Sequence, residues 1–92
     1  MPTMRFPEEV SEEVTKRLRR AEGQVRGVQR MLEEGEDCRA VIMQLSAAQA
    51  ALHRAALRLM AAGMHECLAD PGRAAAEGMT AEQMEELFLS LR

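Results

Sequence analysis

The stretch from Cys38 to Ala69 contains no proline and repeats its small and aliphatic residues in steps of four and three positions. This spacing is that of one face of a continuous α-helix, and an apolar face of that length needs a partner helix along it. Half of the sixteen residues 47–62 are alanine, which lets helix axes approach closely. We therefore expect an all-α protein. The positions of this apolar face are Val41, Leu45, Ala48, Leu52, Ala55, Leu59 and Ala62.

Two further amphipathic segments flank this stretch. In residues 14–32 apolar side chains again recur every three or four positions, and Gly35 is a natural C-terminal stop for that helix. Asp37 is suited to cap the long helix, and Thr80 forms a capping box with Gln83 at the start of a short one. The expected single domain, residues 1–92, therefore has three helices, over about residues 7–34, 38–69 and 80–91, and a Pro- and Gly-containing linker over residues 70–79.

A chain of 92 residues buries too small a share of its surface for a large core of its own, so we expect it to complete that core by forming oligomers. The longest segment without a charged residue, residues 40–53, is too short to span a membrane, and the N-terminal residues lack the apolar core of a signal peptide. We therefore expect a cytoplasmic protein with no membrane partner. No base is spaced to act on either cysteine and no cofactor motif is present, so we expect no enzyme activity.

Positive charge is concentrated in one part of the sequence, although the net charge of the chain is −3. Residues 14–31 hold six basic residues and one acidic residue. Such a run is commonly a solvated helix face, but a basic face also attracts the phosphates of double-stranded DNA. No helix-turn-helix or zinc-finger pattern is present, so we expect phosphate contacts and DNA shape to dominate recognition. The candidate DNA-binding residues are Lys16, Arg17 and Arg20, together with Arg54 and Arg58, an i, i+4 pair on the long helix.

The two cysteines, Cys38 and Cys67, lie 29 positions apart near opposite ends of the expected long helix. At 1.5 Å per residue they are about 43 Å apart and cannot meet within one chain. If two copies of the helix pack antiparallel about an axis near Leu52 and His53, Cys38 of one subunit lies beside the partner subunit's Cys67. Each cysteine could instead be a small buried apolar residue. The first-turn position of Cys38 favours a reactive thiolate, so an interchain thiol pair is the preferred hypothesis.

The sequence RLRRAEGQVRGVQRMLEEGEDC, residues 17–38, with the alanine-rich helix and Cys67, resembles the copper-sensitive operon repressor (CsoR) family of bacterial transcriptional regulators. The resemblance implies an antiparallel four-helix-bundle dimer of three-helix subunits, which assembles into a flat homotetramer. Such a protein represses transcription by binding operator DNA, and an inducer that occupies a site between two subunits releases it. One arginine of the first helix and one of the second matter for operator binding in that family, and they align with Arg17 and Arg54.

Position 63 separates the inducer classes of this family. The resemblance implies that Cu(I) sensors use cysteines at positions 38 and 67 with a histidine at position 63, whereas this chain has Gly63. His65 lies two residues before Cys67 and points to nearly the opposite side of the helix, so it is a poor substitute. Asp37 and Gln83 also stand where copper sensors carry Tyr and Glu. We therefore expect no bound metal, and the cysteine pair resembles that of the persulfide-sensing, CstR-like branch.

In that branch the cysteine pair is modified by sulfane sulfur. We expect the Cys38 thiolate to attack a persulfide or polysulfide, and the partner subunit's Cys67 to resolve the product into an interchain di-, tri- or tetrasulfide that releases DNA. The alternative is a Cu(I)-responsive repressor in which Cys38 and Cys67 bind Cu(I) with the thioether of Met64, although such methionines commonly fill a core. The expected partners are operator DNA, further copies of the chain and small persulfides, with Cu(I) as the alternative cofactor.

Overall fold

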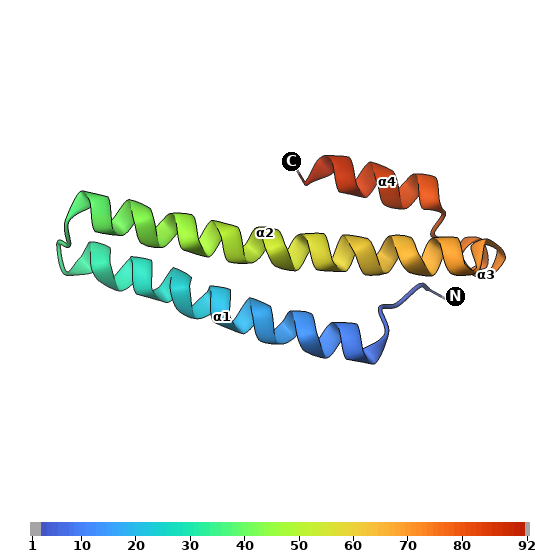
Figure 1. Cartoon of the computed structure of the whole chain (residues 1–92), viewed down its shortest axis with the longest axis horizontal. Coiled ribbons are helices and arrows are strands. Elements are labelled where there is room, and N and C mark those ends of the chain that lie inside the picture. Colours follow the sequence, from blue (N-terminus) through green and yellow to red (C-terminus); the bar gives the residue numbers. More distant parts are fainter. Residues whose placement is uncertain (1–2, 92) are drawn as a thin grey trace. The chain divides into compact units, whose positions relative to one another are not determined.

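The computed structural model describes residues 3–91, and all secondary structure in this part of the chain is helical (Figure 1). The described residues form four helices rather than the three expected. They fall into two compact units: a terminal unit, which holds the residues up to Ser11 and from Ala56 onward, and a hairpin unit, Glu12–Ala55. No helix in the described residues is long and apolar enough to cross a membrane. The helices are α1 (Glu8–Glu33), α2 (Cys38–Ala69), α3 (Pro71–Ala76) and α4 (Ala81–Ser90).

Helix α1 begins directly after a proline and ends shortly before a glycine. The carbonyl oxygen of Pro7 accepts hydrogen bonds from the N–H groups of Val10 and Ser11, at 3.1 and 3.0 Å, which satisfies donors of the first turn. After the helix, Gly35 has a φ of 68°, a left-handed conformation that glycine adopts without steric cost. The helix therefore stops at Glu33, one residue before the expected end.

Helix α2 starts where the sequence predicts, because Asp37 caps it. A carboxylate oxygen of Asp37 accepts a hydrogen bond from the N–H of Ala40 at 3.2 Å, and the Asp37 carbonyl accepts one from Val41 at 3.1 Å. The helix then runs for 32 residues. It ends at Ala69, two residues before Pro71, since the residue that precedes a proline is disfavoured in helical conformation.

The linker expected over residues 70–79 contains a helix, α3, which corrects the prediction. Asp70 caps this helix by accepting a hydrogen bond from the N–H of Arg73 at 3.1 Å. Proline is tolerated in the first turn of a helix, since the N–H group that it lacks would have no partner there, and the three alanines 74–76 favour a helix. After this helix Gly78 has a φ of 90°. The proline that suggested a linker therefore marks the start of a helix.

Helix α4 begins with the capping box that the sequence predicts. The Thr80 hydroxyl accepts a hydrogen bond from the N–H of Gln83 at 3.1 Å, and the Gln83 side-chain oxygen accepts one from the N–H of Thr80 at 2.8 Å. Met84 follows directly and is the buried residue of this helix. The capping box therefore fixes the backbone immediately before Met84.

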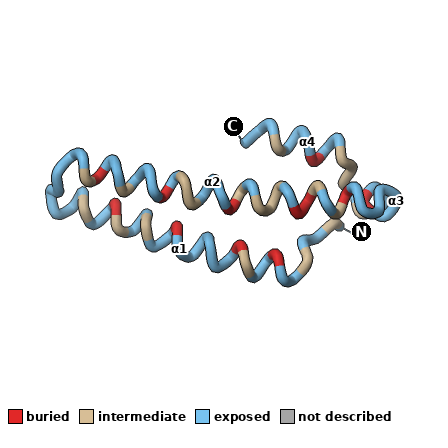
Figure 2. The backbone as a smooth tube through the Cα atoms, viewed as in Figure 1, coloured by how far each residue is buried: buried red, intermediate tan, exposed pale blue. Residues whose placement is uncertain are grey.

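Within the hairpin unit, α1 and α2 pack through every seventh residue (Figure 2). The intervening apolar residues remain open: Leu18 and Val25 on α1 are 41% and 39% exposed, and Leu45 and Leu52 on α2 are 42% and 46% exposed. Each helix therefore uses half of its apolar face inside the unit and leaves the other half exposed in the single chain. The buried residues are Val14, Ala21 and Val28 on α1, and Val41, Ala48 and Ala55 on α2.

Candidate functional site

Cys67 lies in the last turns of α2 and is only 1% exposed. It forms a core cluster with Ala74 of α3 and Met84 of α4. Four partly buried side chains pack against this cluster, and three of them are methionines. The thiol is therefore enclosed by apolar carbon and by thioether groups of the terminal unit. The four partly buried residues are Met4, Met64, Met79 and Ala81.

Two sulfur atoms approach each other at this cluster. The Sγ atom of Cys67 lies 3.9 Å from the Sδ atom of Met4, and the thiol can donate a weak hydrogen bond to the thioether. Burial raises the pKa of the Cys67 thiol, and the carboxylates of Glu66 and Glu82 raise it further. At neutral pH the thiol is therefore protonated, and it must lose that proton before it acts as a nucleophile or as a metal ligand.

Gly63 lies one helical turn before Cys67, on the same side of α2. A Cβ atom at this position would lie 2.7 Å from Cε and 2.9 Å from Sδ of Met84, and 3.6 Å from Cε1 of Phe6. The thioether of Met84 therefore occupies the space in which a larger side chain at position 63 would begin. The sequence alone does not predict a role for Met84 or Met4, because no spacing along the chain links them to α2. The missing side chain at Gly63 is the one signal that points to this space.

Cys38 has a different environment from Cys67. It is the first residue of α2, it is exposed, and it belongs to the hairpin unit. Because 29 positions of one continuous helix separate the two cysteines, a single chain does not bring their thiols together. A site that contains both thiols therefore requires a second copy of the chain.

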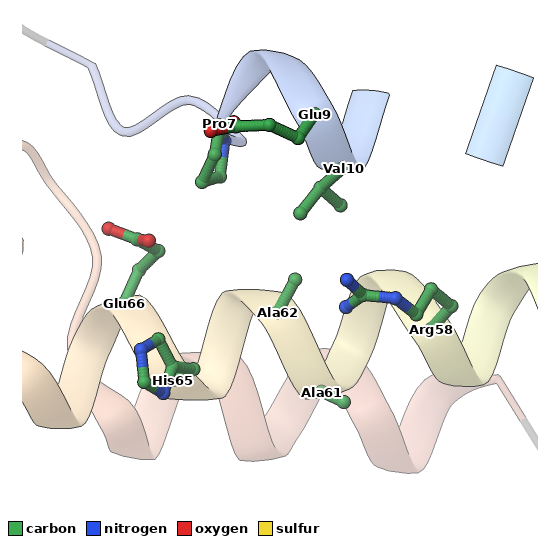
Figure 3. Close-up of a pocket in the computed structure, with 8 residues that line it drawn as sticks. All are labelled: Pro7, Glu9, Val10, Arg58, Ala61, Ala62, His65 and Glu66. Carbon is green, nitrogen blue, oxygen red and sulfur yellow. The ribbon is translucent and has the colours of Figure 1, made fainter. Parts of the chain in front are cut away.

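His65 lines a pocket between the start of α1 and the last turns of α2 (Figure 3). The pocket has a volume of about 530 Å³, and Arg58 and Glu66 also line it. Glu66 accepts a hydrogen bond at 2.7 Å from the Arg73 guanidinium of α3. Within residues 3–91, no cluster of three or more His, Cys, Asp or Glu side chains is placed to hold a metal ion.

The candidate DNA-binding residues are divided between the two units. Arg17 lies 4.0 Å from the Glu13 carboxylate, in an i, i+4 ion pair whose side chains are nearly half exposed, so water screens the pair. Arg58 belongs to the terminal unit and lines the pocket of Figure 3. The other three candidates, like Arg17, are exposed and belong to the hairpin unit. They are Lys16, Arg20 and Arg54.

The sequence profile of one protein family covers most of this chain. The family described as "Metal-sensitive transcriptional repressor" matches residues 11–92. The chain belongs to this family. Among solved structures, the chain is similar to the copper-sensing repressor CsoR with Cu(I) from Geobacillus thermodenitrificans NG80-2, with a TM-score of 0.81 and 33% identity over 98% of this chain and 95% of that chain. It is also similar to the nickel-responsive transcriptional regulator InrS, with a TM-score of 0.65 and 36% identity over 87% of this chain and 86% of that chain.

Two curated proteins are also similar to this chain in sequence. The copper-sensing transcriptional repressor CsoR of Bacillus subtilis (strain 168) is 46% identical over 59 residues, which are 64% of this chain and 58% of that protein. The copper-sensing transcriptional repressor RicR of Mycobacterium tuberculosis (strain ATCC 25618 / H37Rv) is 49% identical over 63 residues, which are 68% of this chain and 62% of that protein. The chain thus spans about three-fifths of the length of each curated relative.

Membership of the metal-sensitive repressor family confirms the CsoR resemblance and the all-helical fold. The four similar proteins are named as transcriptional regulators or repressors, which agrees with the expectation of no enzyme activity. They respond to copper or nickel, so they give no support to the persulfide-sensing branch that Gly63 suggested. The copper-sensing relatives therefore agree better with the Cu(I) alternative than with sensing of sulfane sulfur.

Proposed function

We propose that this metal-sensitive repressor binds operator DNA and releases it when Cu(I) binds at Cys67. The observation that carries the proposal is the burial of Cys67 among methionines, with one thioether sulfur 3.9 Å from its Sγ atom. Thiolate and thioether sulfur are soft ligands that favour Cu(I) over harder cations. The copper-sensing relatives support the same metal. The proposed inducer is therefore Cu(I), which was the alternative to sulfane sulfur in the sequence analysis.

A second subunit supplies the other thiolate in this proposal. Cys38 is exposed at the start of α2, and Cys67 lies near the end of the same helix. An antiparallel pair of α2 helices would therefore place Cys38 beside the partner subunit's Cys67. The exposed apolar residues of the hairpin unit offer the surface that such a pairing buries. Met64, which packs against the Cys67 cluster, is a further thioether available to Cu(I). Two such dimers would form the homotetramer.

The hairpin unit provides most of the DNA-binding surface in this proposal. Its exposed Arg17 and Arg54 would contact phosphates, with Lys16 and Arg20 close by on α1. The exposed ion pair of Arg17 with Glu13 is weak, so the guanidinium can exchange that carboxylate for a phosphate. Arg58, on the terminal unit, would extend the basic surface along α2.

Cu(I) can release DNA only if two conformations of the repressor differ in their affinity for both ligands. A site between subunits favours the arrangement in which its sulfur atoms meet. DNA favours the arrangement in which the basic side chains match the phosphate spacing. Because α2 carries Cys38, Cys67 and Arg54, both ligands act on one continuous helix. Coupling between the inducer and DNA then requires only a change in how α2 helices of different subunits pack.

Release of DNA by Cu(I) tests this proposal. The DNA is a duplex that the protein itself selects from a random library, and binding is followed by fluorescence anisotropy in the absence of oxygen. We expect stoichiometric Cu(I) to lower the DNA affinity by about tenfold or more. Cys67→Ser should retain DNA binding and lose the response to Cu(I). DNA affinity that Cu(I) leaves unchanged in the wild-type protein would contradict the proposal.

Sulfane-sulfur sensing is a second candidate, favoured by the exposure of Cys38 at the N-terminus of α2. The Cys38 thiolate would attack the sulfane sulfur of a persulfide RSSH, and the thiol RSH would leave. The partner subunit's Cys67 would then attack the Cys38 sulfur, so that an interchain disulfide forms and hydrogen sulfide leaves. Mass spectrometry after polysulfide treatment should show subunits joined through these cysteines. An unmodified monomer mass would exclude this candidate.

A further inference from the structure

We propose that Met84 and Met4 are ligands of the inducer site, so that helix α4 supplies a thioether in place of the missing side chain at position 63. The inference rests on the proposed Cu(I) function. It names the residues that bind the metal together with Cys67 in one subunit. The ligand class is a soft monovalent cation, either Cu(I) or its air-stable analogue Ag(I). The site would thus take its ligands from α2, α4 and the N-terminal segment of one subunit, before a second subunit contributes.

Met84 reaches the face of α2 that carries Cys67. Gly63 lies one turn before Cys67, and a Cβ atom there would stand 2.9 Å from the Met84 sulfur. Met84 is itself buried and belongs to the same core cluster as Cys67. The capping box that starts at Thr80 fixes the backbone before it. Met84 is therefore buried, held by its helix and part of the cluster that encloses the thiol.

Met4 approaches Cys67 from the N-terminal segment. The N–H of Met4 donates a hydrogen bond to the Glu77 carbonyl at 3.1 Å, which ties this segment to the residue that follows α3. The Met4 and Cys67 sulfur atoms are 3.9 Å apart. With metal–sulfur distances of about 2.3 Å, two sulfur atoms at this separation can share one cation between them. Only a small movement of either side chain is then needed to bind it.

The chemistry of the ligands selects the kind of cation that this buried site accepts. Binding breaks the S–H bond of Cys67: the proton passes to the solvent, and the electron pair left on sulfur forms the bond to the metal. The thioethers of Met4 and Met84 each donate an electron pair without losing a proton, so they remain neutral. All of these sulfur atoms are soft ligands, which favour Cu(I) or Ag(I) over Ni(II).

X-ray absorption spectroscopy of the full-length protein, prepared with selenomethionine, tests these ligands directly. Anaerobic Cu(I) bound to the wild-type protein should show copper–selenium scattering beside copper–sulfur scattering. Met84→Leu should reduce the selenium signal and weaken Cu(I) binding by about tenfold or more in competition with a Cu(I) chelator. Met31→Leu, in the hairpin unit, is the matched control and should change neither value. Leucine has nearly the volume of methionine, and circular dichroism checks that each variant keeps its helices.

Two results would overturn the inference. One is the absence of copper–selenium scattering in the wild-type protein, and the other is wild-type Cu(I) affinity in Met84→Leu. Met4→Leu should also reduce the selenium signal, and an unchanged signal would refute the part of the inference that concerns Met4. The proposed function fails in a different way. In that case Cu(I) leaves the DNA complex intact even though selenium scattering shows that thioethers bind the metal.

Discussion

The Sδ atom of Met84 lies 2.9 Å from the point at which a Cβ atom of residue 63 would stand, and this approach is possible because residue 63 is glycine. The resemblance to copper sensors places a histidine at this position. The Met84 thioether therefore fills the space in which that side chain would begin. Cys67 packs with Met84 and Ala74 in one cluster, and further methionines pack against it.

Gly63→Ala should weaken Cu(I) binding without unfolding α2. The added methyl group displaces the end of Met84, whose atoms it would meet at 2.7 and 2.9 Å. Alanine favours a helix over glycine by about 1 kcal/mol, which offsets the cost of moving a flexible side chain. We therefore expect the free energy of unfolding to change by about 1 kcal/mol or less. Chelator competition measures the Cu(I) affinity. An affinity equal to that of the wild-type protein would contradict the claim that Met84 binds Cu(I) from the space beside Gly63.

Gly63→His should bind Cu(I) more tightly than Gly63→Ala does. Both side chains displace the Met84 thioether, but the imidazole of histidine replaces it as a ligand. Copper–selenium scattering from selenomethionine should fall in this variant, and copper–nitrogen scattering should appear. Gly63→Ala is the control, since it displaces Met84 and adds no ligand. Selenium scattering of undiminished intensity in Gly63→His would show that Met84 does not occupy the space at position 63 when Cu(I) is bound.

Cys38 should react with iodoacetamide faster than Cys67 in the metal-free protein at neutral pH. Cys38 is exposed, whereas Cys67 is buried. Burial and nearby carboxylates raise the pKa of Cys67, which lowers its fraction of reactive thiolate at any pH below that pKa. The Cys67 rate should therefore rise as the pH increases toward the raised pKa. Timed alkylation with peptide mass spectrometry measures both rates, and faster reaction at Cys67 at neutral pH would refute this prediction.

Arg17→Ala and Arg54→Ala should each weaken DNA binding and leave the oligomer unchanged. Each variant removes one phosphate contact, so the slope of log affinity against log salt concentration should fall by about 1. Arg5→Ala removes the same charge from the terminal unit and should leave the slope unchanged. Anisotropy titrations at several salt concentrations measure the slope, and light scattering measures the oligomer. If both variants keep the slope of the wild-type protein, Arg17 and Arg54 do not contact DNA phosphates.

Thr80→Ala should destabilise α4 and loosen the position of Met84. The variant loses the hydroxyl that accepts a hydrogen bond from Gln83 at 3.1 Å, and such a cap contributes about 1 kcal/mol. Thr15→Ala, at an exposed position within α1, is the matched control and should have little effect. Chemical unfolding at one fixed protein concentration compares the two. Equal losses of stability would mean that the cap does not hold α4.

Most helix boundaries of this chain are predictable because local chemistry sets them. Asp37 and Thr80 act through hydrogen bonds that span three residues, and Gly35 acts through its own backbone conformation. Helix α3 is the exception. Pro71 suits either a linker or the first turn of a helix, and the Asp70 cap decides between them.

The surroundings of Cys67 are not predictable in the same way. Helical periodicity places Met64 on the side of Cys67, since both lie on α2. It does not tell which residue of another segment covers that side. Met4 lies 63 positions from Cys67 along the chain, and its contact with the thiol depends on the packing of the terminal unit. Gly63 therefore suggests a lost metal ligand when the sequence is considered alone, whereas the structure shows what fills its space.

The central claim is that the sulfur ligands around Cys67 make DNA binding by this protein respond to copper. Its most direct test is to measure DNA release side by side with anaerobic Cu(I) and with inorganic polysulfide. We predict that stoichiometric Cu(I) frees the selected duplex and that the subunits then migrate as separate chains on a non-reducing gel. Release by polysulfide with covalently joined subunits, while Cu(I) leaves the complex intact, would contradict the account.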